Sequence, residues 1–225
     1  MAIQHGVPGE RARVKGTVLS LWPLFLVFTC LGAFASAIAL GRQTPLFASL
    51  FFASLIAMAV MWRRGVQRVE SFFVGARGEE RVAGMLAALP QNCHVFNDFV
   101  AAGRQVDHVV VCPGGVFSVE TKYWRGRVTL ESGCVLVDGM LADRAPLRQA
   151  MREAASVQAE LEKTGWQGSV TPVLCFASDT FAAGSADAGS VRLINAQALC
   201  EWLRAQPETL SPAELERLVQ LLSTI

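Results

Sequence analysis

The sequence lacks any closely spaced pair of cysteines. Its six cysteines are scattered and form no C-x-x-C motif; they are Cys30, Cys93, Cys112, Cys134, Cys175 and Cys200. This spacing argues against a zinc ribbon and gives no sign of a disulfide framework. We therefore expect reduced thiols, most of them buried.

The sequence also lacks an excess of basic residues. The formal net charge is +1, and residues 66–225 carry 14 Lys and Arg against 18 Asp and Glu, so this part of the chain is slightly acidic. Proteins that bind nucleic acid over a wide surface are strongly basic. Any contact with nucleic acid must therefore come from a local patch.

Charge is absent from two long stretches near the N-terminus. Lys15 and Arg42 are separated by 26 uncharged residues, and Arg42 and Arg63 by 20. Because a helix needs about 20 apolar residues to cross the hydrocarbon core of a bilayer, residues 17–40 and 46–62 are predicted to form a transmembrane helical hairpin within residues 17–62. Residues 1–16 then form a cytoplasmic N-terminal segment.

Two alternatives to a membrane hairpin are a cleaved signal peptide and a helical hairpin buried in a soluble protein. The first apolar run is long for a signal peptide, a second run follows at once, and neither has a polar face. Basic residues flank the outer ends of both runs, whereas only one lies between them; the outer ones are Arg11, Arg13, Lys15, Arg63, Arg64 and Arg68. The positive-inside rule then predicts a multi-pass protein of the cytoplasmic (inner) membrane with both termini in the cytoplasm.

Residues 66–225 have the length of one domain. Apolar periodicity, Pro and Gly positions and a capping box at Ser211–Glu214 predict a mixed α/β fold, with a central sheet of about four or five strands flanked by helices. The expected helices are 79–89, 147–164, 196–205 and one that begins at Ser211. The expected strands are 94–97, a hairpin within 105–128, one or two strands within 127–137, and 170–177 and 191–194.

The hairpin reads QVDHVVVCPGGVFSVETKYWRGRV, and three charged residues lie at its open end. Asp107 precedes the first apolar run, and Glu120 and Lys122 end the second. Side chains two residues apart on a strand share a face, so Glu120 and Lys122 lie together. Centring the turn on Gly114 places Asp107 opposite Thr121, within one residue of Glu120.

Two carboxylates a few ångströms apart repel one another, and a divalent cation with oxygen ligands, Mg²⁺ or Mn²⁺, relieves that repulsion. Lys122 is then placed to activate an attacking water and to neutralise charge on a phosphate. The alternative is a strand-end salt bridge without function. The D-x12-E-x-K spacing alone leaves both interpretations open.

Four motifs in order carry a resemblance to a known family. They are GARGEERVAGML (75–86), VFNDF (95–99), the hairpin at 105–128, and APLRQA (145–150). Together they resemble the nuclease-related domain family, NERD, over about residues 70–180. That family is assigned to the PD-(D/E)-x-K nucleases, so the resemblance implies a restriction-endonuclease-like core and phosphodiester hydrolysis.

The resemblance also implies roles for individual residues. It assigns the helical acid to Glu79, the central metal ligand to Asp107, the E-x-K pair to Glu120 and Lys122, and the glutamine of the following helix to Gln149. Asp107, Glu120 and the Thr121 carbonyl would hold the metal, and Glu79 would orient water or complete a second metal site.

Some neighbouring residues are ambiguous or depart from the pattern. Glu80 also suits a helix start, so only the family pattern favours Glu79. His108 is expected on the face opposite Asp107 and is not assigned as a ligand. Similar sequences often read N-P-x-x-Q-N where this one has Ala145 and Ala150, which puts a role of the flanking amides in doubt.

A local basic patch is predicted next to these residues. It comprises Arg144, Arg148 and Arg152, four residues apart, and Arg125 and Arg127, which follow Tyr123 and Trp124. The arginines would bind phosphates, and the aromatic rings would stack on unpaired bases. The alternatives are a solvated helix face that includes Glu153 and Glu160, and buried aromatic rings.

The sequence thus predicts a membrane-anchored, metal-dependent nuclease that acts on nucleic acid, with DNA the first expectation, on the cytoplasmic side of the membrane. The alternatives are a non-catalytic module that binds DNA or a protein partner at the membrane, and a membrane protein whose domain scaffolds others.

Overall fold

The computed structural model describes residues 1–39, 41, 45–143 and 145–224. The chain divides into two compact units. One comprises Met1–Glu10 together with Gly75–Ile225, and the other comprises Arg11–Val74. The first unit holds all the strands and the candidate site, so the N-terminal residues fold with the C-terminal two-thirds of the chain.

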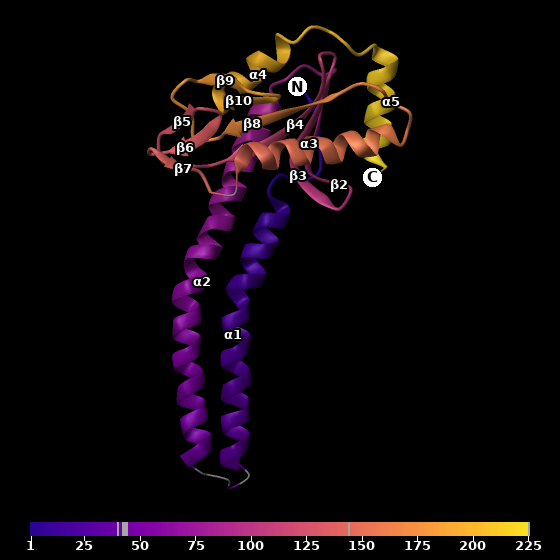
Figure 1. The fold of residues 1–225 in the computed structure, drawn as a ribbon. Coiled ribbons are helices and arrows are strands. Elements are labelled where there is room, and N and C mark those ends of the chain that lie inside the picture. The colour runs from indigo at the N-terminus through magenta and orange to yellow at the C-terminus, as the bar shows by residue number, and fades with distance from the viewer. Residues whose placement is uncertain (40, 42–44, 144, 225) are drawn as a thin grey trace. The chain divides into compact units, whose positions relative to one another are not determined.

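The second unit consists of helix α1 (Glu10–Ala39) and the larger part of α2 (Pro45–Leu86). The two helices run side by side (Figure 1), and the rings of Phe34 and Phe51 stack with centroids 4.7 Å apart. The helix predicted at 79–89 is the C-terminal end of α2.

The predicted transmembrane hairpin is not supported. A helix crosses a bilayer only with an apolar run of about 20 residues, and none of the helices, as far as the structure describes them, is long and apolar enough to do so. This finding contradicts the prediction of a multi-pass protein of the cytoplasmic membrane with both termini in the cytoplasm. The spans predicted at residues 17–40 and 46–62, and the bilayer as a partner, are left without support. Residue 40, the last of the first predicted span, and residues 42–44, between the two predicted spans, lie outside the described residues.

A mixed seven-stranded sheet forms the centre of the first unit, in the order β1-β2-β3-β4-β8-β10-β9 (Figure 1). The β2-β3-β4 meander is antiparallel, β4, β8 and β10 are parallel neighbours, and β9 is antiparallel to β10. The strands are β1 (Ile3–His5), β2 (His94–Ala101), β3 (Arg104–Cys112), β4 (Gly115–Lys122), β8 (Val170–Phe176), β9 (Ser185–Ala188) and β10 (Val191–Asn195).

A small antiparallel sheet and three helices complete the unit. The small sheet contains β5 (Val128–Glu131), β6 (Cys134–Val137) and β7 (Met140–Leu141), and the helices are α3 (Pro146–Glu162), α4 (Ala196–Arg204) and α5 (Pro212–Ser223). The prediction of an α/β fold with a mixed central sheet flanked by helices is confirmed.

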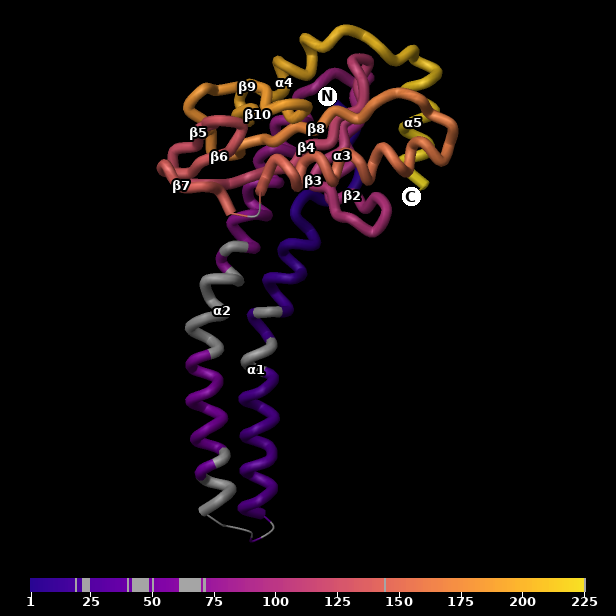
Figure 2. The backbone as a smooth tube through the Cα atoms, in the orientation of Figure 1, coloured from indigo at the N-terminus to yellow at the C-terminus, as the bar shows by residue number. Residues whose placement is uncertain are grey.

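Alternate residues of β3 pack on opposite faces of the sheet, as strand geometry requires. Val109 and Val111 belong to one apolar cluster with residues of α3 and α5, whereas Val110 and Cys112 belong to another with residues of α4 and the end of α2. Helix α3 runs along its face of the sheet in Figures 1 and 2. The sheet is thus covered on both faces, which explains its long apolar strands.

The sheet has seven strands rather than the expected four or five because two short edge strands escaped prediction. Ile3–His5, within the segment predicted as a cytoplasmic tail, pairs in parallel with β2, so that Ile3 lies opposite His94. Ser185–Ala188 alternates exposed and partly buried residues. Neither segment is long enough or apolar enough to show a strand period.

No disulfide forms between the cysteines, all six of which are free. Cys93, Cys112 and Cys175 are buried and Cys134 is exposed. The expectation of unpaired thiols is confirmed.

The capping box predicted at the start of α5 is present and supplies a stability test. The Ser211 hydroxyl accepts a hydrogen bond from the Glu214 N–H at 3.3 Å, and the Ser211 N–H donates to Glu214 Oε2 at 3.0 Å. We expect Ser211→Ala to lower the free energy of unfolding in urea by about 1 kcal/mol, because an N–H of the first turn loses its partner. The control Ser223→Ala, at the exposed end of the same helix, should change it by less than about 0.5 kcal/mol. Equal effects of the two variants would contradict a capping role.

Candidate active site

The β3–β4 hairpin brings Asp107, Glu120 and Lys122 to one end of the sheet. His108 pairs with Val119, so Asp107 lies beside the end of β4, within one residue of the predicted register. Asp107 Oδ2 accepts a hydrogen bond from the Thr121 N–H at 2.8 Å. Lys122 Nζ forms an ion pair with Glu120 Oε1, and only 3% of the Glu120 side chain is exposed.

Helix α3 adds Gln149 and Glu153 to this group. Gln149 Oε1 accepts a hydrogen bond from Lys122 Nζ at 3.0 Å, and Gln149 Nε2 donates one to Glu153 Oε1 at 2.9 Å. Because Glu153 accepts from the amide nitrogen, the amide oxygen must face Lys122. The chain Glu153–Gln149–Lys122–Glu120 therefore fixes the position of the ammonium.

Four carboxyl groups influence one another electrostatically at this site. Burial raises the pKa of Glu79 to about 7, and the negative charges of Asp98 and Glu120 add to the effect. Burial also raises the pKa of Asp107 well above its usual range, and the negative charges of Glu120 and Glu79 raise it further. Burial and the Glu120 carboxylate raise the pKa of Glu153 to about 9. The cluster thus favours bound protons or another source of positive charge.

Among the described residues, two buried carboxylate oxygens have no hydrogen-bond partner. They are Glu79 Oε2 and Glu153 Oε2. An unpaired buried polar atom is unfavourable, and a cation or a proton would satisfy each of these oxygens. The Gly9 N–H donates to the Glu79 carboxylate, so the N-terminal segment contributes a hydrogen bond to the site.

The donor chemistry fits a hard divalent cation. Carboxylate and backbone carbonyl oxygens are the ligands that Mg²⁺ and Mn²⁺ prefer, and the unpaired oxygens of Glu79 and Glu153 are of this kind. Among the described residues, no three His, Cys, Asp or Glu side chains are already arranged to hold a metal. In the arrangement described, the Lys122 ammonium neutralises Glu120. The metal ligands assigned to Asp107, Glu120, Thr121 and Glu79 stay a prediction.

Residues 74–177 match the family model of the nuclease-related domain, NERD. This segment runs from α2 through β8 and contains all four carboxyl groups as well as Lys122 and Gln149. No curated protein and no solved structure matches the chain. The match supports the resemblance to NERD and suggests a nuclease-related function.

Glu153, within the matched residues 74–177, was not expected at the site. A solvated helix face that includes Glu153 was one of the alternatives left open by the sequence, but only 4% of Glu153 is exposed. Its position could have been found from the helical period. The buried stripe of α3 includes Ala150, Ala154, Val157 and Leu161. Glu153 lies three residues after Ala150 and so falls on the same face of the helix. A carboxylate within an apolar stripe is a signal for a buried polar site.

His108 lies away from the carboxyl cluster. It is fully buried, and its Nδ1 is hydrogen-bonded to Asn97 Oδ1 at 2.8 Å. Burial lowers the pKa of His108 to about 3, so the ring is neutral. As expected from strand alternation, the carboxylate of Asp107 and the ring of His108 belong to opposite faces of β3.

The predicted basic patch is divided in the structure. Arg148 and Arg152 line a cavity together with Arg104, whereas Arg125 and Arg127 are exposed in the segment between β4 and β5 and are not among the residues that line it. Arg144 lies outside the described residues.

The two aromatic residues of the predicted patch are packed. The Trp124 ring lies 5.9 Å from that of Phe176, between centroids, and Tyr123 packs against the apolar cluster that contains Val110. This packing favours the alternative of buried aromatic rings over base stacking.

The raised carboxyl pKa values predict that the protein loses stability as the pH rises from 6.5 to 8.5 in a chelator. An unfolded glutamate has a pKa near 4.5, whereas the pKa of buried Glu153 is about 9. The folded state therefore binds more protons in this range, and its stabilisation is full below pH 4.5 and is lost as the pH approaches 9. We expect a loss on the order of 1 kcal/mol in urea unfolding.

The control for this pH dependence is Glu153→Gln, which keeps the shape and removes the titrating group. This variant should lose much of the dependence. His108 does not contribute to the pH dependence of stability above pH 6.5, because its lowered pKa affects stability only between about pH 3 and pH 6.5. Equal stability of the wild type at both pH values would mean that Glu153 is ionised in the folded state.

Proposed function

We propose that the protein is a divalent-metal-dependent nuclease that hydrolyses phosphodiester bonds of nucleic acid, with DNA as the first expected substrate. One observation carries the proposal. Asp107, Glu120 and Lys122 meet at the end of the β3–β4 hairpin, and Gln149 holds the lysine from α3. This group lies within the segment that matches the nuclease-related domain.

The oxygen ligands available suit Mg²⁺ or Mn²⁺. Asp107, Glu120 and the Thr121 carbonyl would hold the ion, with Glu79 near it. When bound, such an ion polarises a phosphate oxygen and makes water a nucleophile at neutral pH.

The residues of the chain supply positioning and charge. Lys122 would hold the attacking water and neutralise negative charge on the phosphate in the transition state. Gln149 and Glu153 would keep the ammonium directed at that position. The water oxygen bonds to phosphorus and gives up a proton to the solvent, the bond from phosphorus to the leaving oxygen breaks, and the leaving oxygen takes up a proton from the solvent.

The ion pair of Lys122 with Glu120 also favours a second candidate, a non-catalytic module that binds DNA or a protein partner. In that module the lysine would serve only to neutralise a buried carboxylate. The two functions differ in what substitutions at the site do to metal binding and cleavage.

Metal binding is expected to require Asp107 and Glu120 together, because neither carboxylate alone supplies enough ligands. Calorimetric titration of the full chain with Mn²⁺ should show binding that weakens at least about tenfold in Asp107→Ala and in Glu120→Ala. The control Asp143→Ala removes an exposed carboxylate and should bind as the wild type does. Unchanged binding in both site variants would leave these acids without a metal role.

Lys122→Met is expected to reduce DNA cleavage in Mn²⁺ by about 10²-fold or more, which is the usual contribution of a group that transfers or orients a proton. Lys122→Arg should not restore cleavage, because the larger, planar guanidinium would not hold the attacking water where the compact ammonium does. The control Lys163→Met breaks an exposed ion pair with Glu160 and should leave cleavage unchanged.

The stability of Lys122→Met must be measured in parallel. The side chain is 20% exposed and Glu120 is nearly buried, so the variant should unfold more easily by about 1–3 kcal/mol in a chelator. Full cleavage by a folded Lys122→Met would contradict the catalytic assignment. If Lys122→Arg recovers the stability that Lys122→Met loses, but still does not cleave DNA, the catalytic assignment of Lys122 is supported.

A further inference from the structure

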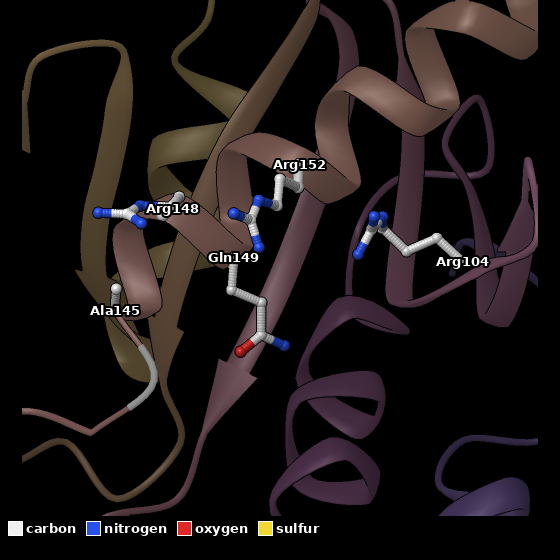
Figure 3. Close-up of a pocket in the computed structure, with 5 residues that line it drawn as sticks. All are labelled: Arg104, Ala145, Arg148, Gln149 and Arg152. Carbon is white, nitrogen blue, oxygen red and sulfur yellow. The ribbon is translucent and has the colours of Figure 1, made fainter.

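A cavity of about 420 Å³ adjoins the candidate active site. It is lined by Arg104, Ala145, Arg148, Gln149 and Arg152 (Figure 3). Arg148 and Arg152 lie one turn apart on α3 and line the cavity together with Arg104, from the start of β3. In Figure 3 the Arg104 side chain extends toward that of Arg152, whereas the Arg148 guanidinium points away from Arg104. Arg104 and the two arginines of α3 therefore line one cavity only in the folded chain.

Among the described residues, the three arginines have no anionic partner. Within the ranges that the structure describes, none of Arg104, Arg148 and Arg152 forms an ion pair or a hydrogen bond through its side chain. Other arginines of the same unit are paired: Arg81 with Asp179 and Arg192 with Asp187. Three like charges around one cavity repel, and an anion in the cavity would relieve that repulsion.

The start of α3 adds to the positive potential of the cavity. The residue before the helix, Ala145, has a left-handed backbone conformation (φ 44°) and offers no side-chain cap to the N–H groups of the first turn. N–H groups at a helix N-terminus favour a bound anion. This contribution supplements the arginines, which carry most of the charge.

Gln149 connects the cavity to the active site. It lines the cavity, and its side-chain oxygen accepts a hydrogen bond from Lys122 Nζ at 3.0 Å. A group bound in the cavity is therefore separated from Lys122 by a single side chain. Such closeness suits two parts of one ligand.

We propose that this cavity binds a phosphate group, with its sugar, of the nucleic-acid strand next to the phosphate that is cleaved. The proposal rests on the proposed nuclease function. Guanidinium groups match phosphate oxygens through paired hydrogen bonds, and the cavity volume lies in the range of small-ligand sites. Arg104 thereby acquires a binding role.

The test is DNA binding by the full chain in a chelator, which separates binding from cleavage. Fluorescence anisotropy with a short labelled single-stranded DNA should show about tenfold weaker binding for Arg104→Ala, Arg148→Ala and Arg152→Ala. Each substitution should also reduce the slope of log K against log salt by about 0.7. The control Arg217→Ala removes an exposed arginine on α5 and should bind as the wild type does.

Inorganic pyrophosphate identifies the source of the phosphate. If pyrophosphate competes with DNA for the wild type, but not for the variant in which Arg104, Arg148 and Arg152 are all replaced by Ala, the cavity is a phosphate site that the strand uses. If the wild type binds pyrophosphate through the three arginines but does not bind DNA, the assignment of the cavity to a nucleic-acid strand is wrong.

The outcomes also separate this proposal from the proposed function. Unchanged DNA affinity and salt slope in the triple arginine variant would overturn the cavity proposal, even if the wild type cleaves DNA. If the wild type does not cleave DNA, but each arginine substitution weakens DNA binding, the result would support the cavity proposal and overturn the proposed nuclease function.

Discussion

The pairing of β4 with strands on both sides is the constraint on which the candidate site depends. β4 is antiparallel to β3 on one edge and parallel to β8 on the other. The first pairing places Asp107 beside Glu120. The second requires a crossover, and α3 provides it on the face that carries Glu120 and Lys122. Gln149 and Glu153 reach the site for that reason, although 27 residues separate Gln149 from Lys122.

Burial gives the site its second property, an excess of negative charge in poor contact with water. Glu79, Glu120 and Glu153 are each less than 9% exposed. Within the part of the chain that the structure describes, the Lys122 ammonium alone forms a hydrogen bond in this group. Carboxylates in such surroundings bind protons or cations more readily than exposed ones. The burial that is expected to destabilise the fold at high pH therefore also favours ligands of positive charge.

The sequence predicted the core of this arrangement because its signals are local. The hairpin has an obvious turn at Pro113 and two apolar runs, and strand alternation alone groups Glu120 with Lys122. Glu153, Arg104 and the strand Ile3–His5 were missed because their roles arise from tertiary contacts. The apolar segment 17–62 gave a wrong prediction. Its hydropathy predicted a membrane hairpin, which the helices, as far as they are described, do not support.

Helix α3 separates two opposite electrostatic environments. Its buried side carries Glu153 toward the carboxyl cluster, and its exposed side carries Arg148 and Arg152, with Gln149 between them. A phosphate strand would be repelled by the carboxylates and attracted by the arginines. Binding at the arginines would bring the next phosphate toward Lys122, where a cation among the carboxylates would turn repulsion into attraction. Strand binding and metal binding would therefore favour one another, and the fold that carries both signs of charge on one helix supplies the physical basis for that coupling.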